Sequence, residues 1–253
     1  MILRHLFACP KCKLTLQIIK NTATCFKCKR IFQKQHEVWN FLIGKDVQTR
    51  HSIYDYEIVH QSPLHGPDDG SYEVLAAFAK GNRTLDVACG DGIIEKLAPQ
   101  TVGLEFSRNA LLKAKKNGAK YLVQANAEAL PFANNSFDVC ICAGSLEHFI
   151  NPQQALSEMS RVSKIQVLTV HSMFNVPGIT VLFKIVSKLL RIQHQPIEKP
   201  ISENKLRNML EKANAHIVFK GVWTLPFNYG RVIPWLPELE KFPSVRFVIS
   251  IKK

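Results

Sequence analysis

Residues 85–92 combine glycines and acids at a spacing that can bind a small ligand. They read Leu-Asp-Val-Ala-Cys-Gly-Asp-Gly, and a helix-like segment, 93–97, follows. A strand that turns through glycines into a helix brings free backbone N–H groups close to a ligand. Nucleotide-type ligands use such a corner at the carboxyl end of a parallel sheet. Asp86 and Asp91 can accept hydrogen bonds there, from a ligand amino group or from water.

A second acid follows at the spacing of one βαβ step. The apolar run 101–104 ends in Glu105, which lies 19 residues after Asp86. An acid at the tip of a second strand is placed to bind both hydroxyls of a ribose. The glycine pattern, A-C-G-D-G, differs from the dinucleotide fingerprint G-x-G-x-x-G. For residues 85–92 taken alone, a tight turn without a ligand remains the alternative.

Four cysteines near the start of the chain are spaced as metal ligands. They form two C-x-x-C pairs separated by twelve residues: Cys9, Cys12, Cys25 and Cys28. Two such turns facing each other complete a tetrahedral zinc site with no position open for chemistry, so the zinc would be structural. The intervening chain alternates like a strand over 14–19 and returns over 22–24, which predicts a zinc ribbon. Unligated or redox-active cysteines are the alternative.

Four segments resemble the class I S-adenosylmethionine (SAM)-dependent methyltransferases. They are similar to the family's motifs, in order and at its spacing: L-D-V-A-C-G-D-G at 85–92, V-G-L-E-F-S at 102–107, A-N-A-E-A-L-P-F at 125–132 and N-S-F-D-V-C-I-C at 135–142. The resemblance covers residues 54–175 well and the rest loosely. It implies an α/β fold with a doubly wound, seven-stranded Rossmann-like sheet, and SAM as the cofactor.

The resemblance also implies a set of cofactor-binding residues. These are Asp86, Ala88, Gly90, Asp91, Gly92, Glu105, Phe106, Asn126 and Ala127. Gly90 and Gly92 would let the backbone approach the methionine part, Glu105 would bind the ribose, and Phe106 would stack beside the adenine. The family usually has an aspartate where this chain has Asn126, whose amide oxygen can still accept from the adenine amine.

The fourth predicted strand is 137–142. In this family the segment that follows this strand faces the transferable methyl group. Ser145 and His148 are therefore the candidate catalytic residues. A histidine has a pKa near neutrality, which suits a general base. The alternative is that His148 only orders the loop, because many methyl transfers need mainly alignment and desolvation.

Three segments are expected along the chain: a zinc ribbon over 1–42, a linker or lid over 43–70, and the methyltransferase domain over 71–253. The ribbon is too short to bury a secure core, so a metal should supply stability. Within the domain, 176–195 predicts a basic amphipathic helix, apolar on one side over 179–191. This helix could contact a membrane surface peripherally, cover a hydrophobic acceptor, or pack on the core.

Helix starts can be placed from capping residues. Ser71, Ser107, Asn151 and Ser202 each precede an apolar-periodic segment, and Pro152 suits a first helical position. The turn before the fifth strand must be shorter than in the family, because Ser163-Lys164 stands where a Lys-Pro-Gly-Gly turn is common.

The composition leaves the acceptor open. The chain has 253 residues and a net charge of +13, which favours polyanions as partners. A small or lipid-like acceptor is the first hypothesis, from the amphipathic helix and an aromatic, proline-rich segment over 223–243. RNA base methylation is the second, from the ribbon, which resembles segments preceding bacterial ribosomal RNA guanine methyltransferases. A non-catalytic partner-binding protein is the third.

The cysteines and the apolar runs bear on location. Seven cysteines, four in C-x-x-C pairs, fit a reducing compartment better than disulfides. We see no secretory pattern and no run of 18 apolar residues, so we expect a cytoplasmic protein without a transmembrane segment.

Overall fold

The computed structural model describes residues 3–44, 70–172, 201–224, 233–234 and 244–253. The predicted linker, the amphipathic helix 176–195 and most of the aromatic segment 223–243 lie outside the described residues.

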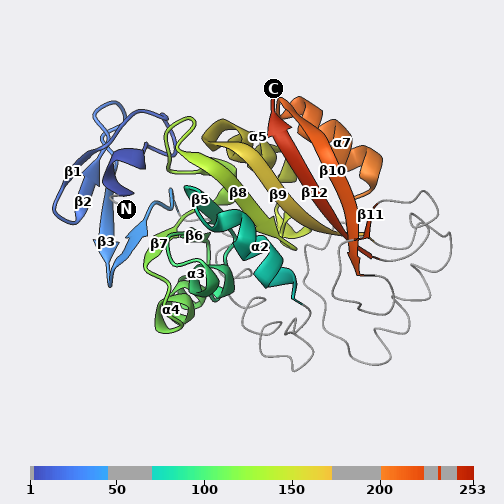
Figure 1. The fold of residues 1–253 in the computed structure, drawn as a ribbon. Coiled ribbons are helices and arrows are strands. Elements are labelled where there is room, and N and C mark those ends of the chain that lie inside the picture. The colour runs from blue at the N-terminus through green and yellow to red at the C-terminus, as the bar shows by residue number, and fades with distance from the viewer. Residues whose placement is uncertain (1–2, 45–69, 173–200, 225–232, 235–243) are drawn as a thin grey trace, which may run out of the picture.

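Twelve strands form one sheet, in the order β1-β2-β3-β4-β7-β6-β5-β8-β9-β12-β10-β11 (Figure 1). The first strands are β1 (Gln17–Ile19), β2 (Thr22–Thr24), β3 (Ile31–Gln35), β4 (Val38–Asn40), β5 (Thr84–Val87) and β6 (Val102–Glu105). The others are β7 (Tyr121–Gln124), β8 (Phe137–Ala143), β9 (Ser163–Ser172), β10 (Ala215–Thr224), β11 (Ile233–Pro234) and β12 (Ser244–Lys252).

The run from β7 to β10 is the predicted seven-stranded sheet. Strands β7, β6, β5, β8 and β9 are parallel neighbours, while β12 pairs antiparallel with both β9 and β10. The order of the parallel strands reverses at β5, which has β6 on one side and β8 on the other. Ligands bind at such a switch point, beyond the carboxyl ends of the strands.

Helices cover both faces of this sheet (Figure 1). They are α2 (Ser71–Ala79), α3 (Ile93–Leu97), α4 (Arg108–Lys116), α5 (Pro152–Val162) and α7 (Glu203–Lys212), with short 3-10 turns at η1 (Leu3–Leu6), η2 (Ala127–Ala129) and η3 (Leu146–His148). Successive strand residues point to opposite faces. On β8, Val139 and Ile141 join the core under α2 and α3, while Cys140 and Cys142 join the core under α5 and α7.

Three of the four predicted caps are confirmed. Ser107 accepts from Ala110 N–H at 3.3 Å, Asn151 from Gln154 N–H at 3.1 Å, and Ser202 from Lys205 N–H at 3.3 Å. The prediction for Ser71 is wrong, because the helix begins at Ser71 and its cap is Gly70, with a left-handed φ of 77°. Strand β9 starts directly after α5, so the expected shorter turn has no linking residue at all.

The N-terminal residues form the predicted β1–β2 hairpin, and β3 and β4 continue it as an antiparallel meander. The segment expected as a separate unit adds to the edge of the large sheet, because β4 pairs in parallel with β7. Its buried residues Phe7, Trp39 and Phe41 belong to the same core as Leu156 and Met159 of α5. Within the part of the chain that the structure describes, we find no helix with the length and apolarity that a membrane crossing requires.

Candidate cofactor site and metal site

The glycine corner is a left-handed turn between β5 and α3. Ala88, Gly90 and Gly92 all have positive φ, at 61°, 55° and 81°. The backbone N–H groups of Ala88 and Cys89 donate to Leu104 O at 2.7 and 3.1 Å. The turn is therefore fastened to the neighbouring strand β6. Its Gly92 packs against α4, where an added Cβ would lie 2.8 Å from Ala114 Cβ.

The carboxylate of Glu105 lies at the centre of the site. It accepts from Phe106 N–H at 2.7 Å, from Ser107 N–H at 2.8 Å and from Gly90 N–H at 3.2 Å. Burial raises the pKa of Glu105, and these three backbone donors oppose that effect. Oxygen Oε2 accepts only the Gly90 bond among these, so it retains capacity for a hydroxyl donor.

Strand β7 and the residues after it form the side of the site beyond Glu105. Gln124, the last residue of β7, donates from Nε2 to Phe106 O at 3.0 Å. Asn126 accepts from Glu128 N–H at 2.8 Å through Oδ1 and so caps η2. This contact uses one of the two lone pairs of the amide oxygen and leaves the NH₂ group available. Ala127, the next residue, is buried.

A pair of buried acids lies under the corner. Asp86 and Glu95 are 2% and 0% exposed, and among the described residues Asp86 Oδ1 and both Glu95 carboxyl oxygens have no hydrogen-bond partner. Burial raises the pKa of Asp86 well above its usual range, and the nearby Glu95 adds to this. Burial raises the pKa of Glu95 to about 8. The pair therefore holds at least one proton near neutral pH.

Gly103 of β6 makes room for this pair. An added Cβ at Gly103 would lie 2.9 Å from both Cys89 Sγ and Glu95 Oε1. Neither Glu95 nor Gly103 was among the site residues predicted from the sequence. The available signal was an acid within the apolar segment 93–97. Cys89 is buried beside Gly103, and desolvation raises the pKa of its thiol well above the usual range.

The end of β8 forms the other side of the switch point. Gly144 N–H donates to Thr169 Oγ1 at 2.8 Å, which ties the turn to β9. Ser145 donates from Oγ to Ala143 O at 2.9 Å, and His148 N–H donates to Ser145 O at 3.1 Å. The two candidate catalytic residues thus share one short turn, and both are partly exposed.

The four N-terminal cysteines come together as the spacing predicts. Their sulfur atoms all lie within 4.8 Å of one another, and Cys9 Sγ is 3.6 Å from Cys28 Sγ. A tetrahedral zinc–thiolate site has sulfurs about 3.8 Å apart, so the donor set fits zinc. None of the seven cysteines forms a disulfide. Without a bound cation the four thiols differ: desolvation raises the pKa of Cys9 to about 12 and also raises that of Cys12, whereas a backbone hydrogen bond from Arg30 lowers that of Cys28 to about 6.

The structure brings the proposed cofactor residues together at the ends of β5, β6 and β7, three adjacent parallel strands. Residues 85–168 match the family described as the methyltransferase domain. Residues 85–168 thus have the sequence pattern of a methyltransferase domain, on a Rossmann-like sheet.

Curated relatives match part of the chain. An uncharacterised protein of Methanocaldococcus jannaschii is 36% identical over 136 residues, which are 50% of this chain and 54% of that protein. The ubiquinone/menaquinone biosynthesis C-methyltransferase of Geotalea uraniireducens is 36% identical over 42% of this chain and 51% of its own length. The demethylmenaquinone methyltransferase of Geobacillus kaustophilus is 36% identical over 36% of this chain and 44% of its own length. The chain spans about half the length of the curated relatives it matches.

Solved structures share the fold. A SAM-dependent methyltransferase of Thermotoga maritima has a TM-score of 0.55 at 20% identity, covering 82% of this chain and 98% of its own. The magnesium protoporphyrin IX methyltransferase of Synechocystis, solved with S-adenosylhomocysteine (SAH), has a TM-score of 0.51 at 16% identity, covering 82% and 94%.

Proposed function

We propose that this chain is a SAM-dependent methyltransferase acting on a small, apolar acceptor, and that its first natural candidates are quinol rings. The main support is the hydrogen bond from Gly90 N–H to the Glu105 carboxylate, which connects the glycine corner to the end of β6. The amide of Asn126 follows β7, the next parallel strand, so all three groups lie near one switch point. This arrangement lies within the matched segment.

Each part of the cofactor has a residue suited to it. The backbone at Gly90 would accommodate the methionine part, with Asp91 as an acceptor for its amino group. Asp86 lies buried under the corner and Gly92 packs against α4, so these two would support the corner from behind. Ala88 shapes the turn that exposes this backbone. Glu105 would bind the ribose through its remaining lone pair. SAM would supply a methyl group on a positively charged sulfur, which an acceptor attacks in line.

The adenine would lie at the end of β7. Asn126 has an NH₂ group and one lone pair left for ring nitrogens and the exocyclic amine. Phe106 and Ala127 would bound the ring, and Gln124 holds the Phe106 backbone in place.

The acceptor proposal rests on the named relatives and on the end of β8. Several relatives are named for methylation of quinone precursors. A quinol carbon becomes nucleophilic when the neighbouring hydroxyl gives up a proton. We assign that hydroxyl proton to the imidazole of His148, and we assign Ser145 to holding the hydroxyl. The carbon would attack the methyl group as the methyl–sulfur bond breaks and SAH leaves, and the same carbon would then lose its hydrogen as a proton, which restores the aromatic ring and the hydroxyl. The second hypothesis, an RNA base, draws support only from the ribbon and the charge.

The test offers acceptor classes separately to the zinc-loaded protein with tritiated SAM. We expect label in a reduced quinone and lipid extract, and label at background in total RNA and in a protein lysate. The matched control is Glu105→Ala, which should lose the signal. Label in RNA would replace the small acceptor by the second hypothesis. No label anywhere, with no binding of SAH, would leave a non-catalytic partner protein.

A further inference from the structure

The ribbon contacts the cofactor side of the domain through backbone pairing. Strand β4 adds in parallel to β7, with Val38 opposite Leu122 and Asn40 opposite Gln124. Immediately after β4, Phe41 N–H donates to Gln124 O at 2.8 Å. The strand that ends at the adenine side of the site is therefore supported along its outer edge by the ribbon.

The loop 125–133 follows β7, and its far end contacts the residues just before the first cysteine pair. Ala8 N–H donates to Pro131 O at 3.0 Å, and Ala133 N–H donates to Leu6 O at 2.8 Å. Phe7 stacks on Phe132 with ring centroids 5.6 Å apart. The loop 125–133, which contains Asn126 and Ala127, is thus fixed by the ribbon at both of its ends.

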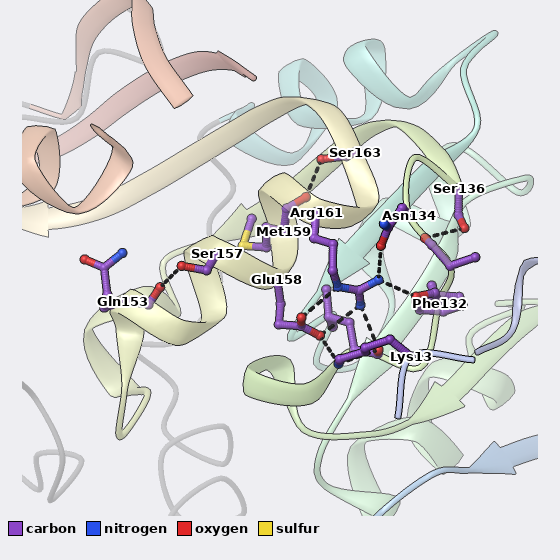
Figure 2. A network of polar contacts seen from close by, with 12 residues as sticks. Lys13, Phe132, Asn134, Ser136, Gln153, Ser157, Glu158, Met159, Arg161 and Ser163 are labelled. Carbon is purple, nitrogen blue, oxygen red and sulfur yellow. Dashed lines mark hydrogen bonds and ion pairs between the residues drawn. The ribbon is translucent and has the colours of Figure 1, made fainter. Parts of the chain in front are cut away.

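A buried ion-pair network adds a third attachment (Figure 2). Lys13 Nζ lies 2.5 Å from Glu158 Oε2, and Arg161 Nε lies 2.7 Å from Glu158 Oε1. Arg161 also donates to Phe132 O at 2.7 Å and to Leu130 O at 3.1 Å. Burial alone would raise the pKa of Glu158, but the two cations hold it below its usual range. Removing Lys13 would leave Arg161 as the one cation that the structure shows beside the buried Glu158 carboxylate, and would break the link from the ribbon to α5.

The metal site fixes where Lys13 lies. Lys13 directly follows Cys12, has a left-handed φ of 59°, and donates its backbone N–H to Cys9 O at 2.8 Å. That turn is the first cysteine knuckle. A zinc ion bound by Cys9 and Cys12 would hold this turn closed, and would thereby hold Lys13 beside Glu158.

We infer that the N-terminal ribbon is an intramolecular brace: zinc held by Cys9, Cys12, Cys25 and Cys28 orders the loop 125–133 and thereby sets the affinity for the adenosyl group. This inference rests on the proposed function for its ligand. It gives the ribbon a role within the chain, where an RNA-binding ribbon would present its knuckles to a partner.

The first test is a pair of matched lysine variants of the full, zinc-loaded chain. Lys13→Met removes the charge that reaches Glu158. Lys34→Met removes a lysine of similar exposure, whose ion pair with Glu37 stays within the ribbon. We expect Lys13→Met to weaken SAH binding about tenfold at unchanged zinc content, and Lys34→Met to change it less than about twofold. Equal affinities for both variants and the native chain would overturn the brace.

The second test removes the zinc with a thiol-directed mercurial and a chelator, and then restores it. We expect faster amide hydrogen exchange over 125–133 and loss of SAH affinity in the zinc-free protein, both reversed by zinc. Unchanged exchange over this loop, with β5 to β9 still protected, would contradict the inference. If the native chain fails to bind SAH, the proposed function fails, while the exchange result still decides on the brace.

Discussion

The carboxylate of Glu105 accepts a hydrogen bond from the backbone N–H of Gly90, 3.2 Å away. This contact joins the tip of β6 to the glycine corner after β5. It means that one side chain both shapes the corner and offers a lone pair to a ligand. A change at Glu105 should therefore alter the loop and the binding site together.

The glycine corner contains one residue that should prefer to be glycine and one glycine that cannot be replaced. Ala88 has a φ of 61°, a region that costs a side chain about 1–2 kcal/mol. We expect Ala88→Gly to raise the unfolding free energy by about 0.5 kcal/mol, after the entropy cost of glycine. Urea unfolding measures this. A large loss of stability would show that the Ala88 methyl packs usefully.

The opposite change at Gly92 should be costly. An added Cβ would lie 2.8 Å from Ala114 Cβ, at a φ of 81°. We expect Gly92→Ala to lower the unfolding free energy by about 3 kcal/mol, from overpacking and backbone strain. Gly118→Ala is the control for strain alone, since it has a φ of 104° and nothing within 4 Å of the added atom. Equal losses for the two variants would argue against the clash with α4.

These two positions also show what the sequence could and could not provide. The motif at 85–92 predicted a glycine turn between a strand and a helix, and the turn is confirmed. The caps at Ser107 and Asn151 were predictable because capping is local. The prediction for Ser71 was wrong because Ser71 is the first residue of the helix and its cap is Gly70, which has no side chain.

The pairing of strands that are far apart in the sequence could not be predicted from local sequence patterns. The ribbon hairpin was predicted from alternation and cysteine spacing, but its parallel addition to β7 joins residues about 80 positions apart in the chain. Glu95 was missed for a related reason. Its burial depends on the small size of Gly103 in strand β6, and nothing in the sequence pattern of 93–97 indicates which residue lies opposite.

The buried acids predict a pH dependence of stability. An unfolded glutamate loses its proton near pH 4.3, whereas Glu95 in the fold does so near 8. Between these values the folded state binds more protons, so the unfolding free energy falls as pH rises from about 5 to 8. We expect Glu95→Gln to be similar to the native chain at pH 5 and more stable at pH 8, by on the order of 2 kcal/mol.

Denaturant unfolding at several pH values between 5 and 8 measures this. Asp138→Asn is the control. Arg83 holds the pKa of Asp138 below its usual range, so its contribution is lost only in more acid solution. The Asp138→Asn curve should therefore run parallel to the native one over this window. Parallel curves for Glu95→Gln would mean that Glu95 is ionised in the fold.

The role of His148 can be separated from loop ordering by kinetics. We expect His148→Gln to lower kcat about 100-fold with a reduced demethylmenaquinone as acceptor, and to remove the acid limb of the pH–rate profile. SAH affinity should remain within about twofold, because His148 lies at the end of β8, away from β6 and β7. A loss confined to KM, with the acid limb intact, would assign His148 to ordering the turn.

We propose that the ends of β5, β6 and β7 bind an adenosyl cofactor. Isothermal titration of the folded, zinc-loaded chain with SAH tests it most directly, alongside Glu105→Ala. We predict a one-to-one binding isotherm for the native chain, and at least about tenfold weaker binding for Glu105→Ala. No heat of binding from the folded native chain, or the same affinity in both proteins, would contradict it.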